Sequence, residues 1–199
     1  MARTPSTADL PDEVEVVQGD LDDTTSVAAA AKGADAAFLL WHTFSPAGVA
    51  EVVAALAAHV GHIVYLSAAD LASETSGPMD GVWADVEEVI ERASVTRTFV
   101  RGGGFAANTL EWAEQTRVGD TVRIPFPGAA RSLVDERDLA AVAVRGLVDP
   151  ELTGKAVTVT GPETLTQVEQ VQVIGAALGR SLTVEEQPVD EAHREFADV

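Results

Sequence analysis

The chain alternates short runs of β-branched and apolar residues with segments whose apolar residues recur at helical spacing. Residues 62–67 are almost continuously apolar, which is typical of a parallel strand buried on both faces. Strand-like runs lie at 14–18, 35–41, 62–67 and 96–101, and helical stripes lie at 24–32, 45–60 and 86–93. Because this order needs crossover helices, the sequence predicts a doubly wound α/β fold with ligands at the carboxyl ends of the strands.

The second half of the chain is less regular. Helices are predicted at 108–116 and 135–147, and short strands at 122–124 and 156–160. Thr166 and Glu169 have the spacing of a capping box, and Gly179 can supply the left-handed residue that ends the helix they begin. Neither an internal repeat nor a clear linker between two domains is visible.

Composition excludes several classes of partner and chemistry. Lys and Arg number 13 against 32 Asp and Glu, and a net charge of −19 repels nucleic acid and anionic lipid. The absence of cysteine excludes disulfides and thiol catalysis. No apolar run approaches the roughly 18 residues of a membrane helix, so we expect a cytoplasmic protein. His59 and His62 lack a third ligand at a metal-binding spacing, and no metal site is predicted.

Small and polar residues follow each apolar run, where ligands are expected. Asp20 could accept a hydrogen bond from an adenine amino group or cap the next helix, and the sequence leaves both interpretations open. Trp41 follows a predicted strand, where its side chain could line a pocket. Residues 102–107 follow the pattern G-x-G-x-x-A, which fits either pyrophosphate binding or a flexible loop close to a ligand. No serine lies in a G-x-S-x-G turn, so a hydrolase is disfavoured.

Four segments in this order resemble the NmrA-like branch of the atypical short-chain dehydrogenase/reductases: residues 14–23, 36–41, 63–67 and 98–108. Residues 135–140 and 160–166 extend the resemblance over most of the chain. It implies an NAD(P)-binding Rossmann-like parallel sheet with helices on both faces, here without the first β-α unit, plus a small C-terminal α/β region on the substrate side. We expect one domain over 1–199, in which 1–107 bind the cofactor and 108–199 form the substrate side and complete the sheet.

The resemblance also implies roles for individual residues. Asp20 and Leu21 would flank the adenine, and Trp41 and His42 would line the cofactor ribose. Ser67, followed by Ala68, would face the nicotinamide. Arg3 would meet a 2′-phosphate, which favours NADP over NAD. The residues expected at the substrate cleft are Trp83, Gly103, Phe105 and Asn108.

Two features of the family pattern are absent. Only 13 residues precede the first predicted strand, too few for the strand and glycine turn that hold the diphosphate, so we expect an N-terminally truncated chain. No Tyr-x-x-x-Lys occurs, because the single tyrosine, Tyr65, is followed four residues later by Ala69. Met79 and Trp83 stand at the positions expected for that pair. Hydride transfer would therefore need a proton from the substrate or from water, and no catalytic residue is identified.

The expected function is that of an NAD(P)H-dependent oxidoreductase acting on a small organic or quinone-like substrate. Two alternatives stay open. The chain could be a non-catalytic dinucleotide sensor that signals through a protein partner, or a fragment with impaired cofactor binding.

Overall fold

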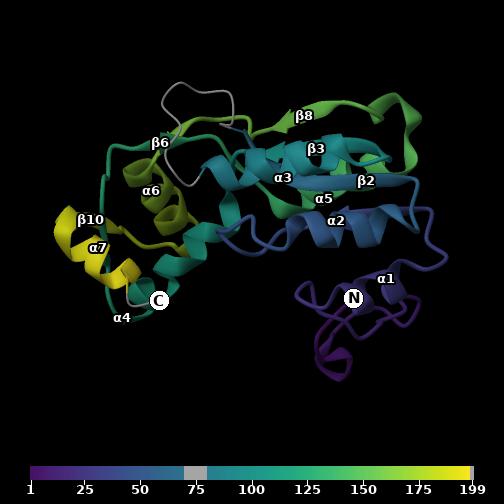
Figure 1. The fold of residues 1–199 in the computed structure, drawn as a ribbon. Coiled ribbons are helices and arrows are strands. Elements are labelled where there is room, and N and C mark those ends of the chain that lie inside the picture. Colours follow the sequence, from purple (N-terminus) through teal and green to yellow (C-terminus); the bar gives the residue numbers. More distant parts are fainter. Residues whose placement is uncertain (70–79, 198–199) are drawn as a thin grey trace. The chain divides into compact units, whose positions relative to one another are not determined.

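The computed structural model describes residues 1–69 and 80–197 (Figure 1). They form two compact units. The first comprises Met1–Gly102 and Leu139–Val159, and the second comprises Gly103–Asp138 and Thr160–Val199. The boundary expected after residue 107 thus falls inside the second unit, and residues 139–159 return to the first.

The first unit contains a four-stranded parallel sheet of order β1-β2-β3-β8. Its strands are β1 (Ala36–Leu39), β2 (His62–Ala68), β3 (Thr96–Gly102) and β8 (Ala156–Val159). Ile63, Val64 and Tyr65 of the inner strand β2 are fully buried, as expected for a strand covered on both faces. The predicted α/β fold with a parallel sheet is confirmed.

Helices cover both faces of this sheet. They are α1 (Thr24–Ala31), α2 (Val49–Ala57), α3 (Asp80–Arg92) and α5 (Glu136–Val148), with short 3-10 turns at Pro5–Thr7 and Pro150–Leu152. Ile63 and Tyr65 share one face of β2 and pack into a core with apolar residues of α1, α2 and α3. On the opposite face Gly146 of α5 lies against Val64 so closely that an added Cβ would come within 3.2 Å of it.

The predicted strand at 14–18 is wrong. Only an isolated parallel bridge joins Ala2 to Gln18, and Val14 is 47% exposed. A strand forms only where a neighbouring backbone accepts and donates its hydrogen bonds. Among the described residues, only Ala2 pairs with the segment 14–18, so the strand pairing ends after one bridge.

The predicted start of α2 at Ser45 and Pro46 is also wrong, since the helix begins at Val49 after Gly48, whose φ is 85°. The Ser45 carbonyl accepts hydrogen bonds from the Trp41 indole and the Thr43 hydroxyl, which bends the chain before the helix can start. The expected inward face of α2 is correct, because Val49, Val52, Val53 and Leu56 are all buried.

The second unit has short paired strands around a smaller core. The parallel pairs are β4 (Gly104–Phe105) with β7 (Leu133–Val134) and β5 (Thr121–Ile124) with β10 (Thr183–Glu186), and the antiparallel pair is β6 (Ala130–Arg131) with β9 (Leu165–Thr166). Its helices are the 3-10 segment η3 (Ala106–Trp112), α4 (Ala113–Val118), α6 (Gln167–Leu178) and α7 (Val189–Ala197). The capping box of Thr166 and Glu169 and the left-handed Gly179 are confirmed at the two ends of α6.

Candidate functional site

Ser67 lies near the carboxyl end of β2, beside Arg101 of β3 in the register of the parallel pair. The serine is 2% exposed, and its Oγ has no hydrogen-bond partner within the part of the chain that is described. A buried hydroxyl without a partner costs about 1–3 kcal/mol. Such a group at the ligand-binding edge of a parallel sheet marks a place where a bound molecule can donate a hydrogen bond to the protein or accept one from it.

An ion pair stands next to Ser67. Arg101 Nε lies 2.9 Å from Glu87 Oε1, and Arg101 Nη2 lies 2.5 Å from Glu87 Oε2, which joins α3 to β3. The hydrogen bonds that Arg101 donates to Glu87 raise the pKa of Arg101, so the guanidinium is charged. The Glu87 side chain is 8% exposed, and this fork fixes α3 over the carboxyl end of the sheet.

Tyr65 shares the face of Ser67, two residues earlier on β2, and its hydroxyl is likewise buried without a partner in the described structure. Burial, and next the negative charge of Glu87, raise the pKa of Tyr65 well above the ordinary range. The ring packs edge-on against Phe99 at 6.3 Å between centroids. Tyr65 is therefore a protonated core residue and is unsuited to act as an acid near neutral pH.

Aromatic residues follow β1 at the same edge of the sheet. The rings of Trp41 and His42 lie 6.1 Å apart, and the Trp41 indole N–H donates to the Ser45 carbonyl at 2.8 Å. Leu21, Trp41 and Trp83 all pack against the core that contains Tyr65. The structure thus packs three of the predicted site residues, Leu21, Trp41 and Trp83, against one core, while His42 is exposed to solvent.

Arg3 and Asp20 flank the bridge between Ala2 and Gln18. The amide of Gln18 lies 3.4 Å from the Arg3 carbonyl, and Asp20 Oδ1 accepts from the backbone N–H of Asp22 at 3.2 Å. The cap of α1 is Asp23, whose carboxylate accepts from Thr25 and Ser26. The capping interpretation of Asp20 is therefore wrong, and its place beside adenine stays a prediction.

The remaining predicted cleft residues, Gly103, Phe105 and Asn108, belong to the second unit. Residues 102–104 lead into the short strand β4 and then into the 3-10 segment η3. In dinucleotide-binding folds the pyrophosphate lies at the N-terminus of an α-helix. The 3-10 segment that follows these glycines therefore disfavours the pyrophosphate interpretation.

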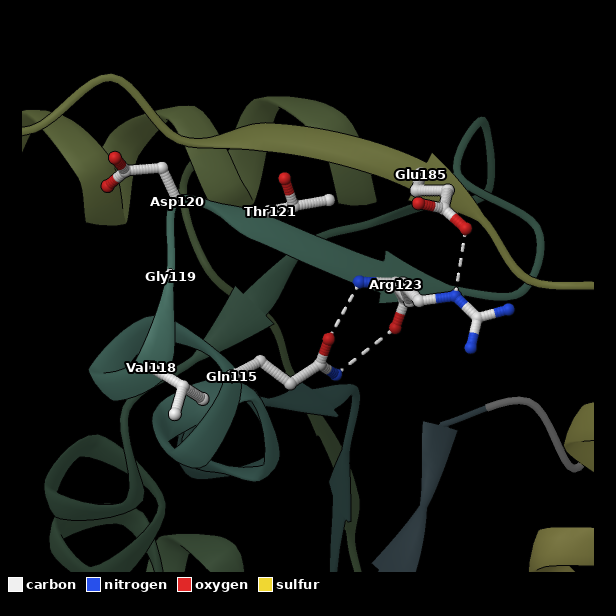
Figure 2. Close-up of a pocket in the computed structure, with 7 residues that line it drawn as sticks. All are labelled: Gln115, Val118, Gly119, Asp120, Thr121, Arg123 and Glu185. Atoms are coloured by element: carbon white, nitrogen blue, oxygen red, sulfur yellow. Dashed lines mark hydrogen bonds and ion pairs between the residues drawn. The ribbon is translucent and has the colours of Figure 1, made fainter.

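A shallow pocket in the second unit lies beside α4, β5 and β10 (Figure 2). Gln115 exchanges hydrogen bonds with the backbone of Arg123, whose Nε lies 3.0 Å from Glu185 Oε1, as Figure 2 shows. Asp120 accepts from Arg180 at 2.6 Å. These polar groups form hydrogen bonds with one another. We therefore assign them a role in stabilising this unit and not in a reaction.

Neither a metal site nor a membrane-spanning helix is found in residues 1–69 and 80–197. No group of three or more His, Asp or Glu side chains is placed to hold a metal ion. No helix in these ranges is long and apolar enough to cross a membrane.

The chain belongs to the NmrA-like family, whose model matches residues 8–198. It is 38% identical over 183 residues to (4-alkanoyl-5-oxo-2,5-dihydrofuran-3-yl)methyl phosphate reductase of Streptomyces griseus, covering 90% of this chain and 64% of the relative. It is 32% identical over 172 residues to NAD(P)H azoreductase of Xenophilus azovorans, covering 84% of this chain and 59% of the relative. The chain thus spans less than two thirds of the length of these relatives.

Among solved structures, the triphenylmethane reductase of Citrobacter sp., in complex with NADP(H), is similar with a TM-score of 0.79. The sequences are 19% identical, and the similarity covers 93% of this chain and 67% of that protein. This likeness establishes a Rossmann-like fold.

Proposed function

We propose that the protein is an NAD(P)H-dependent reductase of a small organic molecule. The observation that carries the proposal is the buried Ser67 hydroxyl at the carboxyl end of an inner parallel strand, which has no hydrogen-bond partner among the described residues. Open α/β sheets bind their ligands at that edge. Membership of the NmrA-like family and the two relatives named as reductases support the same activity.

The described residues fit part of a dinucleotide. Ser67 and Ala68 would hold the nicotinamide, Trp41 and His42 the adjoining ribose, and Asp20 with Leu21 the adenine. Arg3, which is exposed, would meet a 2′-phosphate and so favour NADP. Within 1–69 and 80–197 no paired-glycine fingerprint leads into a helix to hold the diphosphate.

The chemistry divides between the dinucleotide and the chain. When bound, the dinucleotide supplies the hydride. The chain orients the reactants and excludes water through the aromatic residues after β1, and the Ser67 hydroxyl can donate a hydrogen bond to the accepting atom. Tyr65 does not share this role, because its hydroxyl lies in the core.

A second candidate is a dinucleotide sensor without catalysis. It is favoured by the burial of the only tyrosine and by the absence of a Tyr-x-x-x-Lys pair from the sequence. A sensor would bind the dinucleotide and would pass the signal to a protein partner, whereas a reductase would consume NADPH in the presence of an acceptor.

The test is a titration of the purified chain with NADPH and NADH, followed by tryptophan fluorescence and by Tm, since a ligand of the native state raises stability. We expect saturable binding with a Kd below about 100 μM, or roughly −5.5 kcal/mol. Ser67→Ala should weaken binding, and the matched control Ser94→Ala, at an exposed serine before β3, should not.

Each other outcome is informative. Absence of saturable binding to either dinucleotide would contradict both the reductase and the sensor. Binding without NADPH oxidation across a panel of quinone, azo and triphenylmethane acceptors would favour the sensor.

A further inference from the structure

Phe44 is unusually exposed for a phenylalanine. It follows Trp41 and His42 in the loop after β1, and 71% of its surface is open to solvent. Single exposed apolar residues are common on protein surfaces. Phe44 differs because the loop that presents it is fixed and because its ring has an aromatic neighbour.

Side-chain hydrogen bonds shape the loop of residues 41–47. The Trp41 indole donates to the Ser45 carbonyl at 2.8 Å, and the Thr43 hydroxyl donates to the same oxygen at 2.9 Å. The Ser45 hydroxyl in turn accepts from the backbone N–H of Ala47 at 3.2 Å. These bonds bracket Phe44 on both sides, so its exposure follows from the fold of the loop.

The neighbour of Phe44 is Trp83 in the first turn of α3. The two ring centroids lie 6.3 Å apart with an interplanar angle of 75°, an edge-to-face contact. Trp83 is partly buried and packs against the core of the first unit. It therefore anchors the pair, while Phe44 presents ring surface to solvent.

Both residues stand on the α2 and α3 side of the sheet, near its ligand-binding edge. Trp83 lies one helical turn before Glu87, which is joined to Arg101 beside Ser67. Phe44 lies five residues beyond the end of β1. An exposed aromatic surface at this edge can stack with the flat face of another ring.

We propose that Phe44 and Trp83 form an aromatic platform that binds planar aromatic acceptors and makes them the preferred substrate class. This inference rests on the proposed reductase function, since it names the molecules that such a site would select. The surplus of acidic residues adds a second preference, for neutral or cationic rings over anionic ones.

The test measures binding of menadione, a neutral planar quinone, by equilibrium dialysis without dinucleotide. We expect the wild type to bind menadione and Phe44→Leu to bind it about 3- to 10-fold more weakly, because leucine keeps an apolar side chain but loses the ring. The matched control is Phe38→Leu, which alters another partly exposed phenylalanine, on β1 in the same unit. Its affinity should equal that of the wild type.

Comparison of ligands and variants decides the outcome. Cyclohexanone, a carbonyl compound without an aromatic ring, should bind far more weakly than menadione. The proposal is overturned if the wild type does not bind menadione, or if Phe44→Leu and Phe38→Leu lose affinity equally. An unchanged Tm for Phe44→Leu shows that a loss of affinity is local.

A parallel NADPH titration of the wild type separates this proposal from the proposed function. If the wild type binds NADPH but does not bind menadione, the proposed reductase function is retained and the aromatic platform is contradicted. If it binds menadione but does not bind NADPH, an aromatic site is supported and the dinucleotide-dependent activity is contradicted.

Discussion

Two buried hydroxyls on adjacent strands show how differently single residues act in this sheet. Thr98 of β3 is fully buried, and its hydroxyl donates to the Leu152 carbonyl at 2.8 Å. Ser67 of β2 is just as buried, but its hydroxyl has no partner in the described structure. The threonine hydroxyl contributes to stability, whereas the serine hydroxyl makes no such contribution within the described structure.

This difference predicts opposite effects of two similar substitutions. Thr98→Val should lower the free energy of unfolding by about 1–2 kcal/mol, because it removes the hydrogen bonds that the Thr98 hydroxyl makes with the Leu152 carbonyl and the His62 ring. Ser67→Ala should leave stability within about 0.5 kcal/mol of the wild type or raise it, because it removes an unsatisfied polar atom. Urea unfolding measures both values. A loss for Ser67→Ala as large as that for Thr98→Val would show that the serine has an unseen structural partner.

Sequence reasoning identified Ser67 but not Phe44. Ser67 could be found because it ends a continuous apolar run, where a ligand site is expected. Phe44 carries no such signal, since an aromatic residue in a loop is buried or exposed according to the tertiary contacts of its neighbours. The hydrogen bonds of Trp41 and Thr43 to one carbonyl decide that exposure.

At the scale of elements, one arginine connects three segments of the second unit. Arg123 of β5 lies 3.0 Å from Glu185 of β10 and 3.1 Å from Glu191 of α7. The hydrogen bond from Arg123 lowers the pKa of Glu191. The same hydrogen bond, which Glu191 accepts, raises the pKa of Arg123. The attachment of α7 to the strands therefore depends on an ionised Glu191.

This linkage predicts that α7 loosens in acid. Because the pKa of Glu191 is lower in the folded state than in the unfolded state, its contribution to stability is complete above the ordinary glutamate range. The contribution is lost as the pH falls through the lowered pKa. The protection factors of the amides in 189–197 should therefore fall at acidic pH before those of β2 or β3 do. Arg123→Ala should lower the protection factors of 189–197 in the same way at neutral pH, and protection of α7 unchanged by either condition would contradict the linkage.

Elements defined by local contacts were predictable, and those that need a distant partner were not. Thr166, Glu169 and Gly179 define α6 through bonds within a few residues, and the structure has all of them. The strand expected at 14–18 failed, because its pairing depends on a neighbouring strand. An apolar run indicates that a segment can form a β-strand, but it does not identify the strand with which that segment would pair.

For the whole molecule, net charge is the main determinant of how stability responds to salt. Acidic residues exceed basic ones by 19, and most of the ion pairs among the described residues have at least one well-exposed partner. Exposed pairs contribute about 0–1 kcal/mol each. Repulsion among the excess carboxylates therefore outweighs the attraction that salt would screen.

Accordingly, Tm at neutral pH should rise as sodium chloride is increased from low to physiological ionic strength. Thermal unfolding followed by circular dichroism checks this expectation. The same series near pH 4.3, the isoelectric point of the sequence, should leave Tm nearly constant. A fall in Tm with salt at neutral pH would show that the ion pairs dominate.

The sequence by itself determined the fold class, the family and the edge of the sheet at which chemistry is expected. Apolar periodicity and strand ends are properties of consecutive residues, so they can be read without coordinates. Only the tertiary structure decided that Ser67 has no hydrogen-bond partner in the described part of the chain, that Tyr65 belongs to the core, that Phe44 contacts Trp83, and that residues 139–159 return to the first unit. Each of these depends on which distant groups come within a few ångströms, because hydrogen bonding and ring contact act only over that distance.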